Sequence, residues 1–262
     1  MLRYTLILFF FASLNSFSQQ IQVEYFENKI VKNPEEIKQL PAPARKTFEP
    51  NTFSYTLTYV NGISLYENND FSNLNKIETS TELVKLANGE EITQVITFED
   101  TSRVFRIFEK KFFKDYLNKK IYAELFVNEK KQIVDNFYDW QWEITNEKKE
   151  ISGYMCTKAI SKINGYHFEA WFTEEIPISA GPEKFDSLPG LILYVNTGAV
   201  ELVAKSVKFI GNPINLQKPT FTGQTYTFNE VYMKPNTTKP QFKNIIEKDP
   251  NNSNITKQTI TY

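Results

Sequence analysis

Two side chains could supply a nucleophile and its general base: Cys156 and His167, the single cysteine and the single histidine of the chain. Such chemistry needs the thiol and the imidazole within hydrogen-bond distance of each other. Asn164 and Gly165 stand between two β-like runs, the pattern of a two-residue hairpin turn. In that hairpin Cys156 faces Thr173, six residues from His167, or about 20 Å at roughly 3.3 Å per residue. We therefore expect no catalytic dyad within the hairpin.

The same hairpin register assigns the side chains to two faces, because neighbouring strand residues alternate in direction. One face is largely apolar and pairs Ile163 with Tyr166, Ser161 with Phe168, Ala159 with Ala170, and Thr157 with Phe172. The opposite face places Lys158 beside Trp171 as a cation–π pair. Glu169 lies diagonal to Lys158 and is its expected ion-pair partner.

Acidic side chains offer a second enzymatic route, because glycoside hydrolysis uses two carboxyl groups at a fixed spacing. Glu174 and Glu175 are adjacent, so in a strand they point to opposite faces. Asp135, Asp139 and Glu143 lie near aromatic residues, but no pattern brings two of them together. We interpret these acids as solvated surface groups. A secreted, glycosidase-like hydrolase with paired carboxylates stays the alternative function.

The composition argues against metal and nucleic-acid chemistry. One cysteine and one histidine are too few for a zinc site, and we predict neither a metal nor another cofactor. A formal net charge of −1 lacks the clustered positive charge that a nucleic-acid surface needs. A single cysteine also forms no internal disulfide. We interpret Cys156 as a quiet free thiol, with a reactive thiol as the alternative.

The first residues indicate export. Arg3 precedes an apolar segment at 6–12, and Ser16 and Ser18 occupy the two positions that signal peptidase reads. We predict a signal peptide over 1–18 and a single β-rich domain over 19–262. No later segment has the apolar length of a transmembrane helix. The expected location is the periplasm, the outer membrane surface or the exterior.

Strands are the elements expected to position these residues. Aromatic residues make up 15% of the chain, and residues 52–60 alternate between apolar and polar side chains. Asn33 and Pro34, followed by two acids, predict one short helix that ends before Pro41 and Pro43.

The remaining segments complete the fold prediction. Residues 104–117 carry aromatic side chains at helical spacing, but their β-favouring composition predicts strands, joined by turns at Lys119 and Asn128. Residues 235–257 are rich in Pro, Asn, Thr and Lys and predict a long loop or loosely ordered tail. The fold class is all-β: a strongly curved antiparallel sheet or incomplete, bowl-like barrel with one or two short helices.

The most distinctive segment, residues 187–193, reads Ser-Leu-Pro-Gly-Leu-Ile-Leu. It follows a block from Ala170 to Phe185, a Gly-Tyr-Met-Cys-Thr-Lys-Ala run at 153–159 and a Trp-Glu-Ile run at 142–144. In order and spacing, residues 140–193 resemble the GLPGLI family, exported bacterial proteins with no established biochemical function. The resemblance implies that Cys156 occupies the family's cysteine position. Ser187 departs from it, because the family has glycine there, a residue suited to a left-handed backbone.

We interpret the motif first as structural, as a loop that crosses the sheet and plugs into the core. The residues assigned to this role are Gly181, Pro182, Leu188, Pro189, Gly190, Leu191 and Ile192. The functional alternative is that the loop rims a pocket with an aromatic wall. The binding residues predicted on that alternative are Trp171, Phe172, Phe185, Lys158 and Tyr154.

The sequence therefore favours an exported, noncatalytic binding or interaction module of the bacterial cell envelope. Its expected ligand is a glycan, a peptide, a lipid or an envelope protein. The aromatic content and the shortage of nucleophiles, bases and metal ligands support this hypothesis over the hydrolase alternative.

Overall fold

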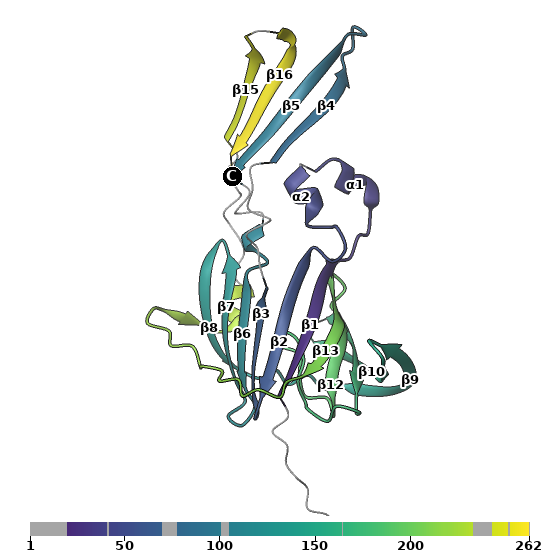
Figure 1. Cartoon of the computed structure of the whole chain (residues 1–262), viewed down its shortest axis with the longest axis vertical. Coiled ribbons are helices and arrows are strands. Elements are labelled where there is room, and N and C mark those ends of the chain that lie inside the picture. The colour runs from purple at the N-terminus through teal and green to yellow at the C-terminus, as the bar shows by residue number, and fades with distance from the viewer. Residues whose placement is uncertain are drawn as a thin grey trace, which may run out of the picture.

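The computed structural model describes residues 20–40, 42–69, 78–100, 105–163, 165–232, 243–250 and 252–261. Within these residues the chain is predominantly β, with a twelve-stranded sheet and a four-stranded sheet (Figure 1). The predicted signal peptide lies outside the described residues. The large sheet is strongly curved and stays open, because its order begins at β14 and ends at β9 without closure. The predicted all-β, curved-sheet fold is confirmed.

The large sheet has the order β14-β8-β7-β6-β3-β2-β1-β13-β12-β11-β10-β9. Its strands are β1 (Gln20–Lys29), β2 (Phe53–Val60), β3 (Ile63–Asn68), β6 (Lys110–Asp115), β7 (Lys120–Val127), β8 (Glu129–Asn136), β9 (Glu143–Ile151), β10 (Tyr154–Ile163), β11 (Tyr166–Thr173), β12 (Leu191–Asn196), β13 (Val200–Phe209) and β14 (Thr225–Tyr226). All the pairs are antiparallel except the short β14–β8 pair, which is parallel.

The small sheet has the order β15-β16-β5-β4 and lies at one end of the molecule (Figure 1). Its strands are β4 (Glu78–Lys85), β5 (Glu91–Asp100), β15 (Lys243–Asp249) and β16 (Asn252–Thr261). The loop or tail predicted over 235–257 is corrected here, because β15 and most of β16 fall within it. The reason is long-range pairing: β16 lies parallel to β5, a partner that the composition of 235–257 cannot reveal.

Alternating side chains build the core of the large sheet. Burial alternates residue by residue over 20–28 of β1 and over 53–57 of β2, as predicted, and the alternation breaks where Leu57 and Thr58 are both buried. Tyr25 and Tyr55 are fully buried, and their hydroxyls donate hydrogen bonds to the backbone oxygens of Ile192 and Phe108. Because both phenol hydroxyls have hydrogen-bond partners, the two tyrosines can be buried without an unsatisfied polar group.

Short helices pack beside the sheets: α1 (Pro34–Lys38), α2 (Ala42–Lys46) and α4 (Phe228–Tyr232). The Asn33 side chain caps α1 by accepting a hydrogen bond from the backbone N–H of Glu35. Helix α1 ends at Lys38, before Pro41, as predicted. Pro43 instead lies in the first turn of α2, where its missing N–H has no helical partner to lose.

The strands predicted over 104–117 are correct for only part of the segment. Phe105 and Phe108 lie in a short helical turn, and β6 begins at Lys110. The predicted turns are confirmed, because Lys119 and Asn128 join β6 to β7 and β7 to β8 with φ values of 52° and 62°.

A buried loop joins β11 to β12; residues 174–190 are called the plug loop here. Ile176, Ala180, Phe185 and Leu188 are at most 1% exposed, and both core clusters include plug-loop residues. Loops normally run over the surface because their backbone polar groups need partners. The plug loop finds such partners, including the hydrogen bond from the Ile192 N–H to the Ala180 oxygen at 2.9 Å.

Lys114 of β6 anchors the plug loop from the core. Its ammonium donates hydrogen bonds to the backbone oxygens of Gly181 and Phe185 at 3.0 and 2.7 Å and lies 3.6 Å from an Asp186 carboxylate oxygen. Burial lowers the pKa of Lys114 to about 8, against the opposing effect of Asp186. Burial likewise raises the pKa of Asp186.

Lys110, four residues before Lys114 on β6 and so on the same face of the strand, makes the second anchor. Its ammonium lies 2.6 Å from the carboxylates of both Glu27 on β1 and Glu183 in the plug loop. Burial acts to lower the pKa of Lys110, but the two carboxylates outweigh it, and the pKa is raised. Two lysines of β6 thus tie the plug loop to the sheet.

Backbone geometry explains the glycine and serine of the motif. A Cβ at Gly190 would lie 2.1 Å from the backbone oxygen of Thr173, so only glycine fits. Ser187 has a φ of 69°, which is the left-handed conformation expected at this position. Its hydroxyl donates a hydrogen bond to Asp186, a partner that glycine would lack.

Candidate functional site: an aromatic pocket beside the plug loop

A pocket of about 410 Å³ opens beside the plug loop. This volume falls within the roughly 300–1,000 Å³ typical of small-molecule sites. Six segments contribute to its lining, which consists of Tyr138, Trp140, Ile163, Tyr166, Phe168, Lys184, Thr197, Asn229 and Tyr232. Five of these nine side chains are aromatic and one is charged.

The β10–β11 hairpin supplies one wall of the pocket. Its register matches the prediction at every pair from Ile163 with Tyr166 to Thr157 with Phe172. The predicted apolar face is buried at its far end and continues into the pocket at its turn end. Tyr166 is 68% exposed there, so its ring is accessible to a ligand.

Trp140 forms the floor and is held in place from two sides. Its ring stacks on Phe185 at 4.7 Å and meets the edge of Phe168 at 5.3 Å. Its indole N–H donates to the backbone oxygen of Lys184, and its own backbone oxygen accepts from the Ser161 hydroxyl. Plug loop and hairpin therefore fix the floor together, which preorganises the pocket.

Lys184 of the plug loop provides the charge of the pocket. Its ammonium lies over the rings of Tyr138, Tyr232 and Phe228 at 5.0, 5.2 and 5.8 Å. Burial lowers the pKa of Lys184, and the nearby Glu183 opposes that effect. The negative faces of these three rings stabilise the partly desolvated ammonium of Lys184.

The residues predicted to bind a ligand lie elsewhere. Lys158 and Trp171 form the predicted cation–π pair at 5.9 Å, and Lys158 reaches Glu169 at 3.4 Å, but on the hairpin face opposite to the pocket. Phe172 and Phe185 are 0% exposed and belong to the core beneath the pocket. Phe172 of β11 and Phe185 of the plug loop are therefore closed to solvent, because they pack into the same core cluster.

Tyr154 packs partly buried against the core, and the predicted motif residues Gly181, Leu188, Gly190, Leu191 and Ile192 are buried as the plug interpretation expects. Pro182 is buried too, whereas Pro189 is exposed. The sequence carries one signal for the aromatic pocket: the aromatic cluster at 137–142, which supplies Tyr138 and Trp140.

Cys156 is fully buried, and its thiol lies 3.5 Å from the backbone oxygen of Tyr154. Burial raises the pKa of this thiol to about 11, so the thiolate is scarce at neutral pH. His167 is exposed and lies opposite Lys162, which is six residues from Cys156 along β10. The two side chains do not form a dyad, as expected from the register.

The candidate carboxylates serve structural contacts. Glu175 accepts a hydrogen bond from the Met155 N–H, and Asp135 accepts one from the Phe228 N–H at the start of α4. Glu27 and Glu183 do converge, but both pair with the ammonium of Lys110 rather than opening onto a cleft. Among the described residues no group of three His, Cys, Asp or Glu side chains is placed to hold a metal ion.

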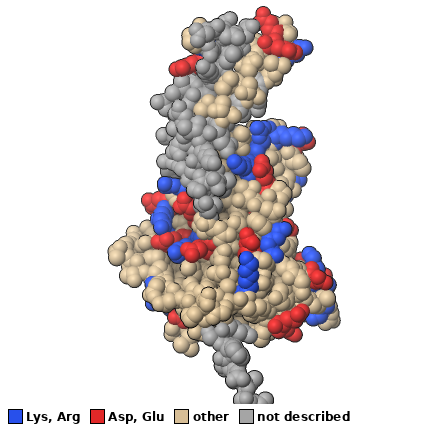
Figure 2. Space-filling model, viewed as in Figure 1, with Lys and Arg blue, Asp and Glu red and all other residues tan. Residues whose placement is uncertain are grey.

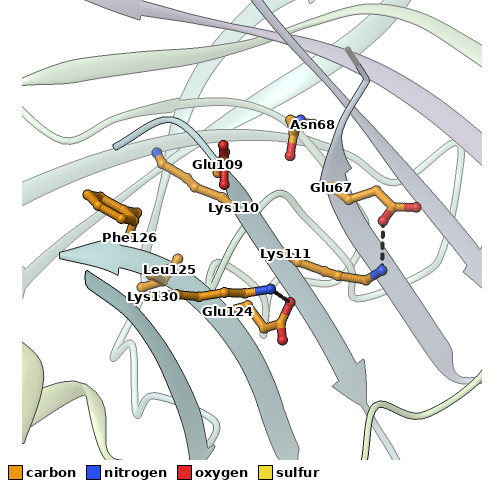
Figure 3. A pocket seen from close by; sticks show the side chains of 9 residues that line it. All are labelled: Glu67, Asn68, Glu109, Lys110, Lys111, Glu124, Leu125, Phe126 and Lys130. Carbon is orange, nitrogen blue, oxygen red and sulfur yellow. Dashed lines mark ion pairs between the residues drawn. The ribbon is translucent and has the colours of Figure 1, made fainter. Parts of the chain in front are cut away.

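A second, charged pocket of about 280 Å³ lies across β3, β6, β7 and β8 (Figure 3). Lys111 pairs there with Glu67 at 3.0 Å, and Lys130 pairs with Glu124 at 2.8 Å. Exposed pairs of this kind contribute little and already satisfy each other. The face of the molecule in Figure 2 likewise intersperses both signs of charge. The aromatic pocket is thus the better candidate for ligand binding.

None of the helices within the described ranges has the length and apolar character needed to cross a membrane. One solved structure, "Structure of PNGF-II in P21 space group", shares the fold with a TM-score of 0.50, and "Structure of PNGF-II in C2 space group" also matches, with a TM-score of 0.46. Each is 16% identical over 88% of this chain. The chain spans only 36% and 35% of their lengths, respectively.

No curated protein matches the chain. Residues 68–227, which include all of the hairpin, the plug loop and the segment 140–193, match the family described as "N-glycanase peptide, N-terminal domain". Because this match covers more than half of the chain, the protein belongs to the N-glycanase N-terminal domain family.

Proposed function

We propose that the chain is an exported, noncatalytic module that binds carbohydrate in the aromatic pocket. The observation that carries this proposal is the arrangement of the exposed Tyr166 and Tyr232 rings and the partly exposed Phe168 ring around one open cavity, above the buried Trp140. The apolar C–H face of a sugar ring carries partial positive charge and fits the negative face of an aromatic ring. Asn229 adds a neutral polar side chain for sugar hydroxyls.

The family supports a glycan over the other expected ligands, a peptide, a lipid or an envelope protein. Its description names an N-glycanase, so the proposed ligand class is a protein-linked or envelope glycan. Export is part of this proposal and rests on the predicted signal peptide. The resemblance to the GLPGLI family stays a prediction beside it.

A noncatalytic role fits the state of the candidate groups. The thiol is buried, and the two converging carboxylates are bridged by a lysine rather than open to a substrate. The glycosidase-like alternative predicts that the purified chain releases sugar from a glycan it binds. Release of sugar would contradict the noncatalytic proposal.

The test is binding of the purified full chain to an array of N-glycans and bacterial envelope polysaccharides. Tyr166→Ala should weaken binding at least tenfold, because it removes an accessible ring from the pocket wall. Phe209→Ala is the matched control, since Phe209 on β13 is similarly exposed, at 62%, and does not line the pocket. Absence of glycan binding by the wild type, or equal binding by Tyr166→Ala, would overturn the proposal.

A further inference from the structure

Lys184 gives the aromatic pocket a net positive charge. It is the only charged residue among the nine that line the pocket. Its nearest acidic neighbour in sequence, Glu183, is engaged 2.6 Å from the ammonium of Lys110. The acid on α4, Glu230, accepts hydrogen bonds from Thr227 instead. No carboxylate lines the pocket itself, and Glu183, which opposes the lowering of the Lys184 pKa, lies outside the lining.

Among the described residues, the ammonium of Lys184 has no hydrogen-bond acceptor and no ion-pair partner. A lysine ammonium carries three N–H donors. In the described part of the chain its contacts are the rings of Tyr138, Phe228 and Tyr232, which accept no conventional hydrogen bond. A partly desolvated cation with unused donors favours an incoming anion, because charge-assisted hydrogen bonds are stronger than neutral ones and water competes less in such a site.

We propose that the aromatic pocket selects a saccharide bearing a carboxylate, with the acid group paired to Lys184 and the sugar ring against the aromatic wall. The inference rests on the proposed carbohydrate-binding function and names the class of sugar: a uronic acid or another carboxylated saccharide. The rings orient the sugar face, and the single cation sets the position of the acid. Neutral sugars make the ring contacts but leave the Lys184 donors unpaired.

The experiment compares two probes that differ at one carbon, methyl β-glucuronide and methyl β-glucoside. Binding of each to the purified full chain is measured by ligand-observed NMR titration. The wild type should bind the glucuronide about tenfold more tightly, and this preference should shrink as salt is added, because ions screen the pairing.

Three variants complete the design. Lys184→Met keeps the side-chain length and should abolish the preference while glucoside binding persists. Lys184→Arg should retain it, because the charge remains. Lys205→Met is the matched control: Lys205 lies over the Phe26 ring at 5.4 Å and does not line the pocket, so its removal should leave the preference intact. Thermal unfolding confirms that each variant is folded.

The outcomes separate the two proposals. Equal affinity for both glycosides, or a preference that survives Lys184→Met, overturns the inference and leaves carbohydrate binding standing. A wild-type chain that binds neither glycoside, nor any glycan on the array, overturns both.

Discussion

At the scale of single residues, the thiol, carboxylate and ammonium groups buried in the core make structural contacts. Cys156 is buried with a raised pKa, and Glu27 and Glu183 hold Lys110. Lys114 is the extreme case: a fully buried ammonium whose donors serve the carbonyls of the plug loop. No local pattern marks it, because Lys110, Lys111 and Lys114 look alike in sequence. Only pairing of the strands and burial distinguish them.

Lys114→Met should therefore lower the free energy of unfolding by about 3–5 kcal/mol at pH 7, because it leaves Asp186 buried without its cation. Lys111→Met is the control on the same strand, where the ion pair with Glu67 is half-exposed, and should cost less than about 1 kcal/mol. Urea unfolding measures both. Equal losses for the two variants would contradict the buried anchor.

The same residue predicts a pH dependence. Burial lowers the pKa of Lys114 from 10.5 to about 8 in the folded chain. Between these values the unfolded chain binds a proton that the folded chain does not, so this group makes the free energy of unfolding rise with pH. The difference between wild type and Lys114→Met should grow from pH 8 to pH 10 in urea unfolding. Parallel pH profiles would show that Lys114 keeps an ordinary pKa.

At the scale of elements, the sequence predicts local pairing well and distant convergence poorly. The hairpin register from Thr157 to Phe172 follows from its turn and alternation, and the structure matches it. The burial of the plug loop could be predicted from its apolar residues and from the positions of its Gly and Pro residues. The pocket does not, because Tyr138, Lys184 and Tyr232 come from segments that no periodicity relates. Two members of the predicted wall, Phe172 and Phe185, are buried because the plug loop carries Phe185 into the core beside Phe172.

The entry of the plug loop into β12 tolerates no side chain at position 190. Gly190→Ala would place a Cβ 2.1 Å from the backbone oxygen of Thr173, so a strand must move. We expect a loss of at least about 3 kcal/mol in the free energy of unfolding, the upper end of overpacking costs. Gly211→Ala is the control, since nothing lies within 4 Å of its Cβ, and it should change stability by about 0.5 kcal/mol or less. Thermal and urea unfolding decide between them.

At the scale of the whole molecule, composition and alternation predict one curved sheet, and the large sheet agrees. The small sheet was missed, because its β16 joins β5 in parallel across more than half of the chain. Parallel pairing leaves no hairpin signal, and β16 is rich in polar residues. Topology of this kind is set by packing between distant segments rather than by local pattern.

The two sheets should respond differently to loss of the C-terminal strands. Truncation after Tyr232 removes β15 and β16 and leaves β4 and β5 as a lone two-stranded ribbon, which is at best marginally stable in water. Hydrogen exchange measured by mass spectrometry should show β4 and β5 losing protection. Strands β1, β2 and β13 should keep theirs, because each is paired on both sides within the large sheet. Protection retained in β5 would mean that its pairing with β4 suffices, whereas protection lost in β1 would mean that the sheets fold as one cooperative unit.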